Sequence, residues 1–257
     1  ITVGETVTLN AVLEVGGQIS GTVLNAVTDL PLAGAQVSII DPANGYVVSG
    51  GSTNEVGFYQ ARAIRAGSYQ VRFYIEPAYG YNLVPEWYNN QRSQSTADLV
   101  SVTQGATLTG IDAELEAGAT IRGRVTRASD GAPIEGVYVG IMDDANDQWV
   151  TGTMTDAGGY YTLSNLNAGT YVVYFSATDY RFEYYQDARD LVDAERLTVT
   201  YGSVLNGINA SLEEGGKVSG SVTSETNNAP LEGVYVYAVS QTDQWNGLGY
   251  TNANGEF

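Results

Sequence analysis

The chain has 257 residues with 29 acidic and 11 basic side chains, a net charge of −18, and neither cysteine nor histidine. This charge disfavours nucleic acids and anionic membranes as partners, because both repel an acidic protein. The missing residue types exclude disulfides, histidine-ligated zinc sites, thiol nucleophiles and histidine-based triads. No apolar stretch reaches the roughly 18 residues of a membrane span, so we expect no membrane insertion in this segment.

One sequence pattern occurs almost three times along the chain. Each occurrence opens with Gly-Gly or Gly-Ala and a short strand, beginning at Gly16, Gly118 and Gly215. A Pro-x-x-Gly segment follows, starting at Pro31, Pro133 and Pro230. A turn comes next, starting at Thr53, Thr155 and Thr251, and its second residue, Asn54, Asp156 or Asn252, is a typical turn former. Such repetition indicates tandem domains of one kind.

Alternating apolar residues predict the strands of each unit. Val137, Val139 and Ile141 alternate with Tyr138 and Gly140, which is the pattern of a strand with one buried face. Equivalent patterns occur at 35–39 and 234–238, at 69–73 and 171–175, and in the last strand of each unit at 9–13, 111–115 and 208–212. No segment carries a sustained helical stripe, and residues 188–196 are expected to form at most one helical turn. The predicted class is all-β.

The landmarks divide the chain into four parts. Residues 1–15 match the last strand of a preceding repeat, 16–117 and 118–214 are complete repeats, and 215–257 are the first part of a further, truncated repeat. We interpret the chain as a segment of a longer tandem array. Residues 116–119 and 213–216 connect the repeats without a Pro- or Ser-rich linker, so a semi-rigid rod is expected.

Three motifs carry a resemblance to a known family. They are [GA]-x-[IV]-x-G-x-V from Gly17, Ala119 and Gly216, P-[LI]-x-G-[AV]-x-V from the three prolines, and T-[DN]-x-x-G-x-[YF] from the three threonines. The chain resembles the carboxypeptidase regulatory-like domain of bacterial surface proteins. The resemblance implies a tandem array of seven-stranded, Ig-like or transthyretin-like β-sandwich domains. It also implies a location outside the cell or at its surface.

A structural calcium ion is the one cofactor that the sequence suggests. Asp143, Asp144, Asn146 and Asp147 place four oxygen-bearing side chains in five residues, as a hard cation requires. The loop lacks the spacing of an EF-hand, and the alternative is an acidic hairpin loop in solvent.

Exposed aromatic residues suggest a second kind of site. Tyr138, Tyr235 and Tyr237 alternate with inward-facing aliphatic residues, while Trp149 and Trp245 follow close to a hairpin. Outward aromatic side chains stack on sugars or anchor a protein partner. The alternatives are contacts with a neighbouring domain or cross-strand pairs.

Repetition and short connections favour a structural role. The chain is predicted to be a spacer or fibre segment of an extracellular bacterial stalk or filament, and not an enzyme. It would self-associate into fibres or continue as one long tandem chain. The alternatives are an adhesin module that binds carbohydrate or another surface ligand, and an accessory region of a larger secreted enzyme.

Overall fold

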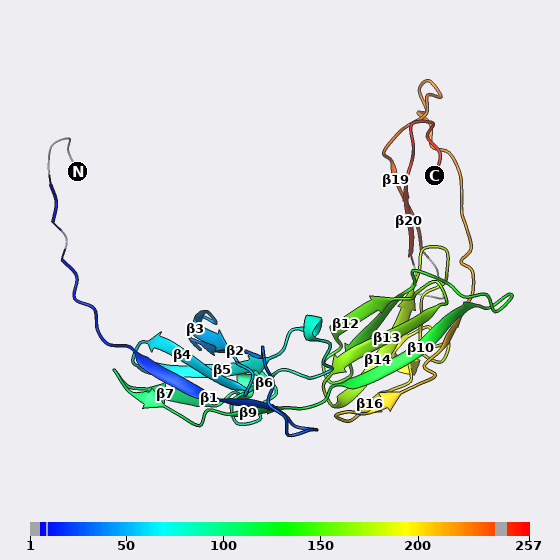
Figure 1. Ribbon diagram of the computed structural model, residues 1–257. Helices are drawn as coiled ribbons and strands as arrows, with labels where there is room; N and C mark the ends of the chain where they lie inside the picture. The colour runs from blue at the N-terminus through cyan, green and yellow to red at the C-terminus, as the bar shows by residue number, and fades with distance from the viewer. Residues whose placement is uncertain (1–5, 9, 240–245) are drawn as a thin grey trace. The chain divides into compact units, whose positions relative to one another are not determined.

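The computed structural model describes residues 6–8, 10–239 and 246–257 (Figure 1). These residues form strands and short 3-10 turns at Pro77–Tyr79, Gln94–Thr96 and Leu191–Asp193, with no α-helix among them, which confirms the all-β prediction. The third turn lies within the segment where a helical turn was expected. No helix in the described part of the chain has the length and hydropathy needed to cross a membrane.

The chain forms two compact units. The first comprises Ile1–Ile121, Leu163–Gly169 and Val199–Leu205, and the second comprises Arg122–Thr162, Thr170–Thr198 and Asn206–Phe257. The first unit therefore contains residues 1–15, all of the first sequence repeat, the first residues of the second repeat and two further segments of it.

Two sheets build the first repeat. In one, β1 (Gly17–Asn25) is antiparallel to β4 (Phe58–Ile64) and parallel to β8 (Thr107–Leu108) and β9 (Ala113–Leu115). The other has the order β3-β2-β5-β6, with β7 also paired to β5. Its strands are β2 (Gln36–Ile40), β3 (Val47–Ser52), β5 (Gly67–Tyr74), β6 (Glu86–Trp87) and β7 (Leu99–Val102).

The second repeat has the same two sheets in the same order. One contains β10 (Ala119–Arg127), β13 (Tyr160–Leu166), β17 (Val204–Leu205) and β18 (Ala210–Leu212). The other contains β11 (Tyr138–Asp143), β12 (Gln148–Met154), β14 (Gly169–Ser176), β15 (Glu183–Tyr184) and β16 (Leu197–Val199). The chain thus carries two tandem β-sandwich-like domains.

Each sandwich shows nine strand segments where seven strands were expected. β8 and β9 both run parallel to β1, and Gly110, with φ of 76°, interrupts them. β6 and β7 both pair with β5, and the loop between them contains Asn89 and Asn90 in left-handed conformations. Because positive φ values cannot continue a strand, these residues split the two edge strands.

Inward-facing residues of both sheets form the core of each sandwich. In the first repeat, the rings of Tyr59 and Phe73 meet edge to face with centroids 5.9 Å apart. The hydroxyl of Tyr59 donates to the carbonyl oxygen of Ile111 at 2.7 Å, which satisfies the one polar group of this buried ring. Tyr161, Phe175 and Ile208 repeat the arrangement in the second repeat.

The described residues before Gly16 and after Glu214 form no sandwich. The strand expected over residues 9–13 is not present in their described part, and Val12 and Leu13 are 95% and 90% exposed. Leu9 lies outside the described residues. Among the residues described, no partner strand is available to this segment, and an isolated strand leaves its backbone groups unpaired.

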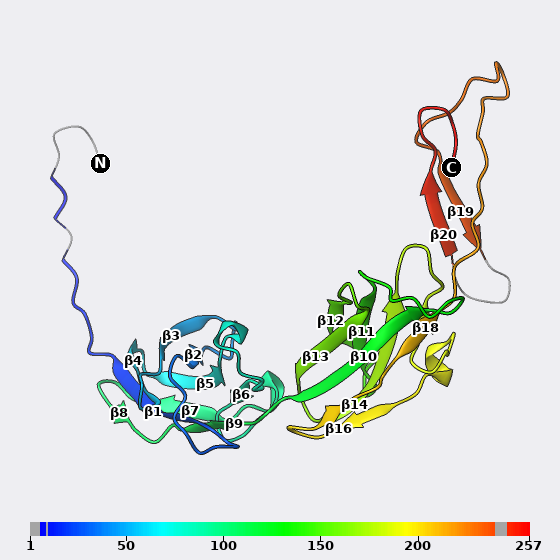
Figure 2. The same cartoon turned by 45° about the vertical axis from the view of Figure 1, so that its right-hand side comes forward.

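The third copy of the pattern, residues 215–257, contains one hairpin in its described part, β19 (Tyr235–Val239) with β20 (Asn246–Tyr250) (Figure 2). The opening strand expected at 218–222 is reduced to an isolated bridge between Ser221 and Glu256. Val234 and Val236 stay partly exposed because no second sheet covers them in the described part of this repeat.

Candidate functional site

Three threonines that open the recurring turn are buried, namely Thr53, Thr155 and Thr251. The hydroxyl of Thr155 accepts a hydrogen bond from the backbone N–H of Val137 at 2.9 Å and donates to the carbonyl oxygen of Ile134 at 2.7 Å. The following residues accept backbone hydrogen bonds within their own turns, as predicted for Asn54, Asp156 and Asn252. The sequence shows that these threonines recur, but the pattern alone did not predict that their hydroxyl groups are buried and bond the backbone.

The predicted outward aromatic residues of the second repeat lie on one face of the sheet β12-β11-β14-β15. Trp149 is 60% exposed, and its indole Nε1 donates to the hydroxyl of Tyr138 at 2.8 Å. Three further rings, not predicted from the sequence, continue this group. Centroid distances are 6.0 Å from Tyr138 to Tyr174, 5.6 Å from Tyr174 to Phe182 and 5.0 Å from Phe182 to Tyr184. We call these five residues the aromatic face.

Glycines beneath the aromatic face bring the rings close to the sheet. A Cβ atom on Gly140 would lie 2.2 Å from Cζ of Tyr174, and one on Gly152 would lie 2.3 Å from the hydroxyl oxygen of Tyr138. Both rings therefore lie over backbone that carries no side chain.

The aromatic residues of the truncated repeat form a smaller group. Tyr235 and Tyr237 are 50% and 61% exposed, with ring centroids 5.8 Å apart. Tyr250 joins them at 5.2 Å from Tyr235. Trp245 lies outside the described residues.

The residues predicted to bind calcium make hydrogen bonds within the protein. Oδ1 of Asp143 accepts the N–H of Ala145, and Oδ1 of Asn146 accepts the N–H of Gln148, each at 2.9 Å. Asp147 has a left-handed backbone with φ of 54°. These bonds are those of a tight turn.

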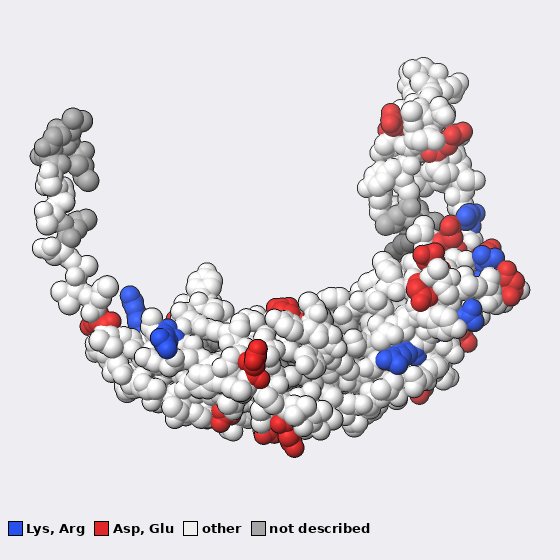
Figure 3. All heavy atoms as spheres, viewed as in Figure 1, with Lys and Arg blue, Asp and Glu red and all other residues white. Residues whose placement is uncertain are grey.

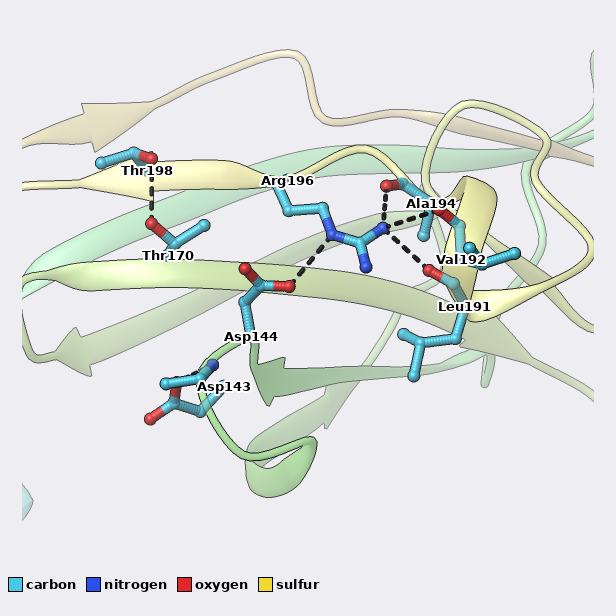
Figure 4. A network of polar contacts seen from close by, with 9 residues as sticks. Asp143, Asp144, Thr170, Leu191, Val192, Ala194, Arg196 and Thr198 are labelled. Carbon is cyan, nitrogen blue, oxygen red and sulfur yellow. Dashed lines mark hydrogen bonds and ion pairs between the residues drawn. The ribbon is translucent and has the colours of Figure 1, made fainter.

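Asp144 is paired with a guanidinium group (Figure 4). Its Oδ1 lies 3.0 Å from Nε of Arg196, whose Nη1 also donates to the carbonyl oxygens of Leu191 and Ala194 at 2.8 and 2.6 Å. Among the described residues, no cluster of three or more acidic side chains is placed to hold a metal ion. The calcium site stays a prediction, and a bound ion would have to compete with Arg196.

Each repeat also buries one glutamate that sequence reasoning missed. Glu86 lies on β6 and Glu183 on β15, with exposures of 0% and 1%. Each faces an arginine six residues later, with 3.4 Å from Glu86 Oε2 to Arg92 Nη1 and 3.6 Å from Glu183 Oε2 to Arg189 Nη1. The sequence signal is a recurring Glu between aromatic or proline residues, followed by Arg at the same spacing.

Burial dominates the titration of these carboxyl groups. It raises the pKa of Glu86 to about 7 although Arg92 and the backbone N–H of Glu114 favour the charged form. Burial and then Asp187 raise the pKa of Glu183 to about 7 against the effect of Arg189. Both groups are enclosed in the fold, so they are poorly placed to meet a substrate from solvent.

Charged side chains of both signs are scattered over the face of the molecule in Figure 3. Basic residues do not gather there into the continuous patch that nucleic-acid binding requires.

Comparison with known families decides the classification. Residues 18–85 and 120–212, more than half of the chain, match the carboxypeptidase regulatory-like domain. The chain belongs to this family. The matched ranges lie in the two complete repeats, so the resemblance inferred from the motifs is confirmed. No curated protein matches the chain.

Solved structures with a similar arrangement are bacterial surface proteins and pilins. The TIE protein of Bacillus anthracis is 15% identical with a TM-score of 0.32, and the match covers 95% of this chain and 43% of that protein. A streptococcal ancillary pilin is 13% identical with a TM-score of 0.33, covering 94% and 85%. The shaft pilin SpaA of Lactobacillus rhamnosus GG is 13% identical with a TM-score of 0.35, covering 80% and 100%. The similarity is distant and concerns the fold alone.

Proposed function

We propose that this carboxypeptidase regulatory-like chain is a spacer or fibre segment of an extracellular bacterial stalk or filament, without catalytic activity. The observation that supports it best is the direct succession of sandwich strands. β9 ends the first repeat at Leu115, and β10 opens the second at Ala119. Repeats joined in this way extend a chain with little loss of stiffness.

The first connection is hydrogen-bonded within its own compact unit. The N–H of Val84 donates to the carbonyl oxygen of Glu116, and the N–H of Gly118 donates to that of Asn82, both at 2.9 Å. The amide Nδ2 of Asn82 returns a bond to the carbonyl oxygen of Gly118 at 2.7 Å. This segment therefore has the backbone pairing of ordered structure, which a flexible linker lacks.

The second connection repeats the pattern within the second unit. The N–H of Arg181 donates to the carbonyl oxygen of Glu213 at 2.9 Å, and that of Gly215 donates to Asp179 at 2.8 Å. An exposed ion pair joins Asp179 Oδ1 to Nζ of Lys217, the only lysine of the chain, at 2.9 Å. The same hydrogen-bonded connection follows both repeats. This favours a spacer or fibre role, in which adding repeats lengthens the protein.

Electron microscopy of native, untreated cells tests the proposal directly. Immunogold labelling with antibodies against the first repeat should mark uniform surface rods along their length. Labelled short particles that carry a separate globular head would contradict the filament role and place the activity in that head. Preadsorbing the antibody with the purified chain provides the control.

Joint stiffness has its own test. Inserting Gly-Gly-Ser-Gly-Gly-Ser after Ala117 should broaden the distribution of maximum dimensions in small-angle X-ray scattering. A matched insertion after Gly45, in an exposed hairpin turn, should leave the distribution close to that of the native chain. Equal distributions for the native chain and the joint variant would contradict a semi-rigid spacer.

A further inference from the structure

We propose that the aromatic face of the second repeat, Tyr138, Trp149, Tyr174, Phe182 and Tyr184, binds a neutral glycan. This site goes beyond the spacer role and does not depend on it. The site lies on the outer side of the sheet β12-β11-β14-β15, within the second compact unit.

The first argument is the way in which the rings are presented. Tyr174 lies over Gly140, and Tyr138 lies over Gly152, where a Cβ atom would collide with each ring. Glycine beneath an aromatic ring lets the ring settle on the backbone. Trp149 is exposed, and the other four rings of the face are half-buried. The hydrogen bond from Trp149 to Tyr138 fixes the indole beside them at 2.8 Å. The C–H groups on the apolar face of a sugar pack against such electron-rich ring faces.

The second argument is the extent of the face. Neighbouring ring centroids from Tyr138 through Tyr174 to Tyr184 lie 6.0 and 6.3 Å apart, so the rings cross three strands in sequence. Each tyrosine adds a hydroxyl group to this row. A ligand with hydroxyl groups along its whole length, such as an oligosaccharide, matches this distribution of polar atoms. A protein hot spot instead concentrates in a central, desolvated pocket.

The third argument is charge. Asp190 and Asp147 lie near enough to Tyr184 to add to the effect of burial in raising the pKa of its hydroxyl. Carboxylates accept hydrogen bonds from sugar hydroxyls but repel uronic acids and sulfated sugars. The arginine–ring stacks found among the described residues are elsewhere, on Tyr74, Tyr160 and Tyr201. This environment selects a neutral glycan over an anionic one.

The first repeat provides a natural comparison because it keeps only one ring of the face, Trp87 at the position of Tyr184, and that ring is 9% exposed. Gln36 and Arg72 stand at the positions of Tyr138 and Tyr174 in the equivalent strand pairs. Arg72 stacks on its own neighbour, with its guanidinium carbon 5.0 Å from the centroid of Tyr74. Of these two repeats, only the second therefore carries the complete aromatic face. The fold itself does not require it, because the first repeat folds in the same way without it.

The test uses the full chain with hexasaccharides of glucose, mannose and xylose, and with hexagalacturonate as the anionic probe. Isothermal titration calorimetry should detect at least one neutral hexasaccharide with a Kd between about 10 µM and 1 mM, and no binding of hexagalacturonate. Trp149→Ala should weaken that binding about 10-fold or more, the loss of one stacked ring. Tyr174→Leu should do the same and provides a second variant if the first fails to fold.

Two matched controls separate the face from general aromatic exposure. Tyr160 is 56% exposed but lies on β13 in the other sheet, and Tyr46 is 73% exposed in the first repeat. Tyr160→Ala and Tyr46→Ala should change the affinity less than about 2-fold. The variant Tyr235→Ala/Tyr237→Ala should also leave most of the binding in place.

Four results would overturn the proposal. They are the absence of binding by every neutral hexasaccharide at millimolar concentration, equal affinities for the native chain and Trp149→Ala, tighter binding of hexagalacturonate, and loss of binding only when Tyr235 and Tyr237 are replaced. A fifth result would also overturn it. If the native chain dimerises but binds no glycan, and Trp149→Ala abolishes the dimer, the aromatic face binds a second copy of the chain.

Discussion

Glu183 Oε2 lies 3.6 Å from Nη1 of Arg189, whereas Oε1 of the same carboxyl group is buried without a hydrogen-bond partner among the described residues. The ion pair is therefore incomplete. The cost of removing the carboxylate from water, together with repulsion from Asp187, exceeds the stabilisation of the charged form by Arg189 and Arg181, and the pKa of Glu183 rises to about 7. In the first repeat the equivalent oxygen of Glu86 accepts the backbone N–H of Glu114 at 3.3 Å, yet its pKa is raised to about the same value.

Because the pKa values of Glu86 and Glu183 are raised, we expect the chain to be more stable in mild acid than at alkaline pH. Unfolding returns each pKa from about 7 to its ordinary value of 4.5. The protonated, folded form is thus favoured below pH 4.5, and this contribution is lost as the pH rises through 7. Urea unfolding should show a free energy that falls between pH 5 and pH 8.5, by up to about 3 kcal/mol for each repeat.

The matched variant is Glu86→Gln/Glu183→Gln. It should flatten the pH dependence and raise the stability at pH 8.5, while repulsion among surface carboxylates remains in both proteins. An unchanged slope in the variant would show that surface charge alone sets the pH dependence.

Thr155→Val should destabilise the second repeat by about 1–3 kcal/mol. Valine keeps the shape but removes the acceptor for the N–H of Val137 and the donor to the carbonyl oxygen of Ile134, leaving both buried. Chemical denaturation measures the change. Thr162→Val, at an exposed position of β13, should stay within about 0.5 kcal/mol of the native chain. Equal stabilities for both variants would remove the proposed role of the recurring threonine.

Asn82→Ala should loosen the first connection. The side chain donates to the carbonyl oxygen of Gly118 and to Oγ1 of Thr120, and its Oδ1 accepts the N–H of Asn165 at 2.6 Å, all within the first compact unit. Its loss should cost about 1–3 kcal/mol and speed amide hydrogen exchange at 116–120. Asn44→Ala, in an exposed turn, is the control. Unchanged exchange at 116–120 would contradict the structural role of Asn82.

Calcium and EDTA should each shift the melting temperature by less than about 1 °C. Arg196 already neutralises Asp144, and Asp143 and Asn146 are engaged by their own turn. Differential scanning calorimetry with and without the ion measures the shift. A rise of several degrees with calcium that Asp143→Asn removes would instead establish the metal site.

Gly140→Ala should fold but lose the arrangement of the aromatic face. The three atoms nearest to the new Cβ atom all belong to the far end of the Tyr174 ring, which can swing away, so the stability loss should be below about 1 kcal/mol. Glycan affinity should nevertheless fall as it does in Trp149→Ala. Gly216→Ala, which meets no atom within 4 Å, should leave both stability and affinity unchanged. If Gly140→Ala binds the glycan as tightly as the native chain, the placement of Tyr174 does not contribute to the affinity.

The sequence by itself determined the repeat, the turns, and the strands with alternating apolar residues in the first two repeats. Val37 and Ile39 are buried as their alternation predicts, and the side chains of Asn54 and Asp156 accept backbone N–H groups within their own turns. These features depend on residues close together in the chain, so a pattern of a few residues is enough to reveal them. The outward position of Tyr138 followed from the same alternation, whereas Trp149 was singled out by its place close to a hairpin.

Only the tertiary structure decided what surrounds those residues. β14 pairs with β11 and brings Tyr174 beside Tyr138, and β15 pairs with β14 and brings Tyr184 beside Tyr174. Spacing along the chain does not reveal these neighbours. The raised pKa of Glu183 likewise depends on burial by strands from several parts of the repeat. Local periodicity specifies which face of a strand is inward, whereas strand order specifies which side chains share that face.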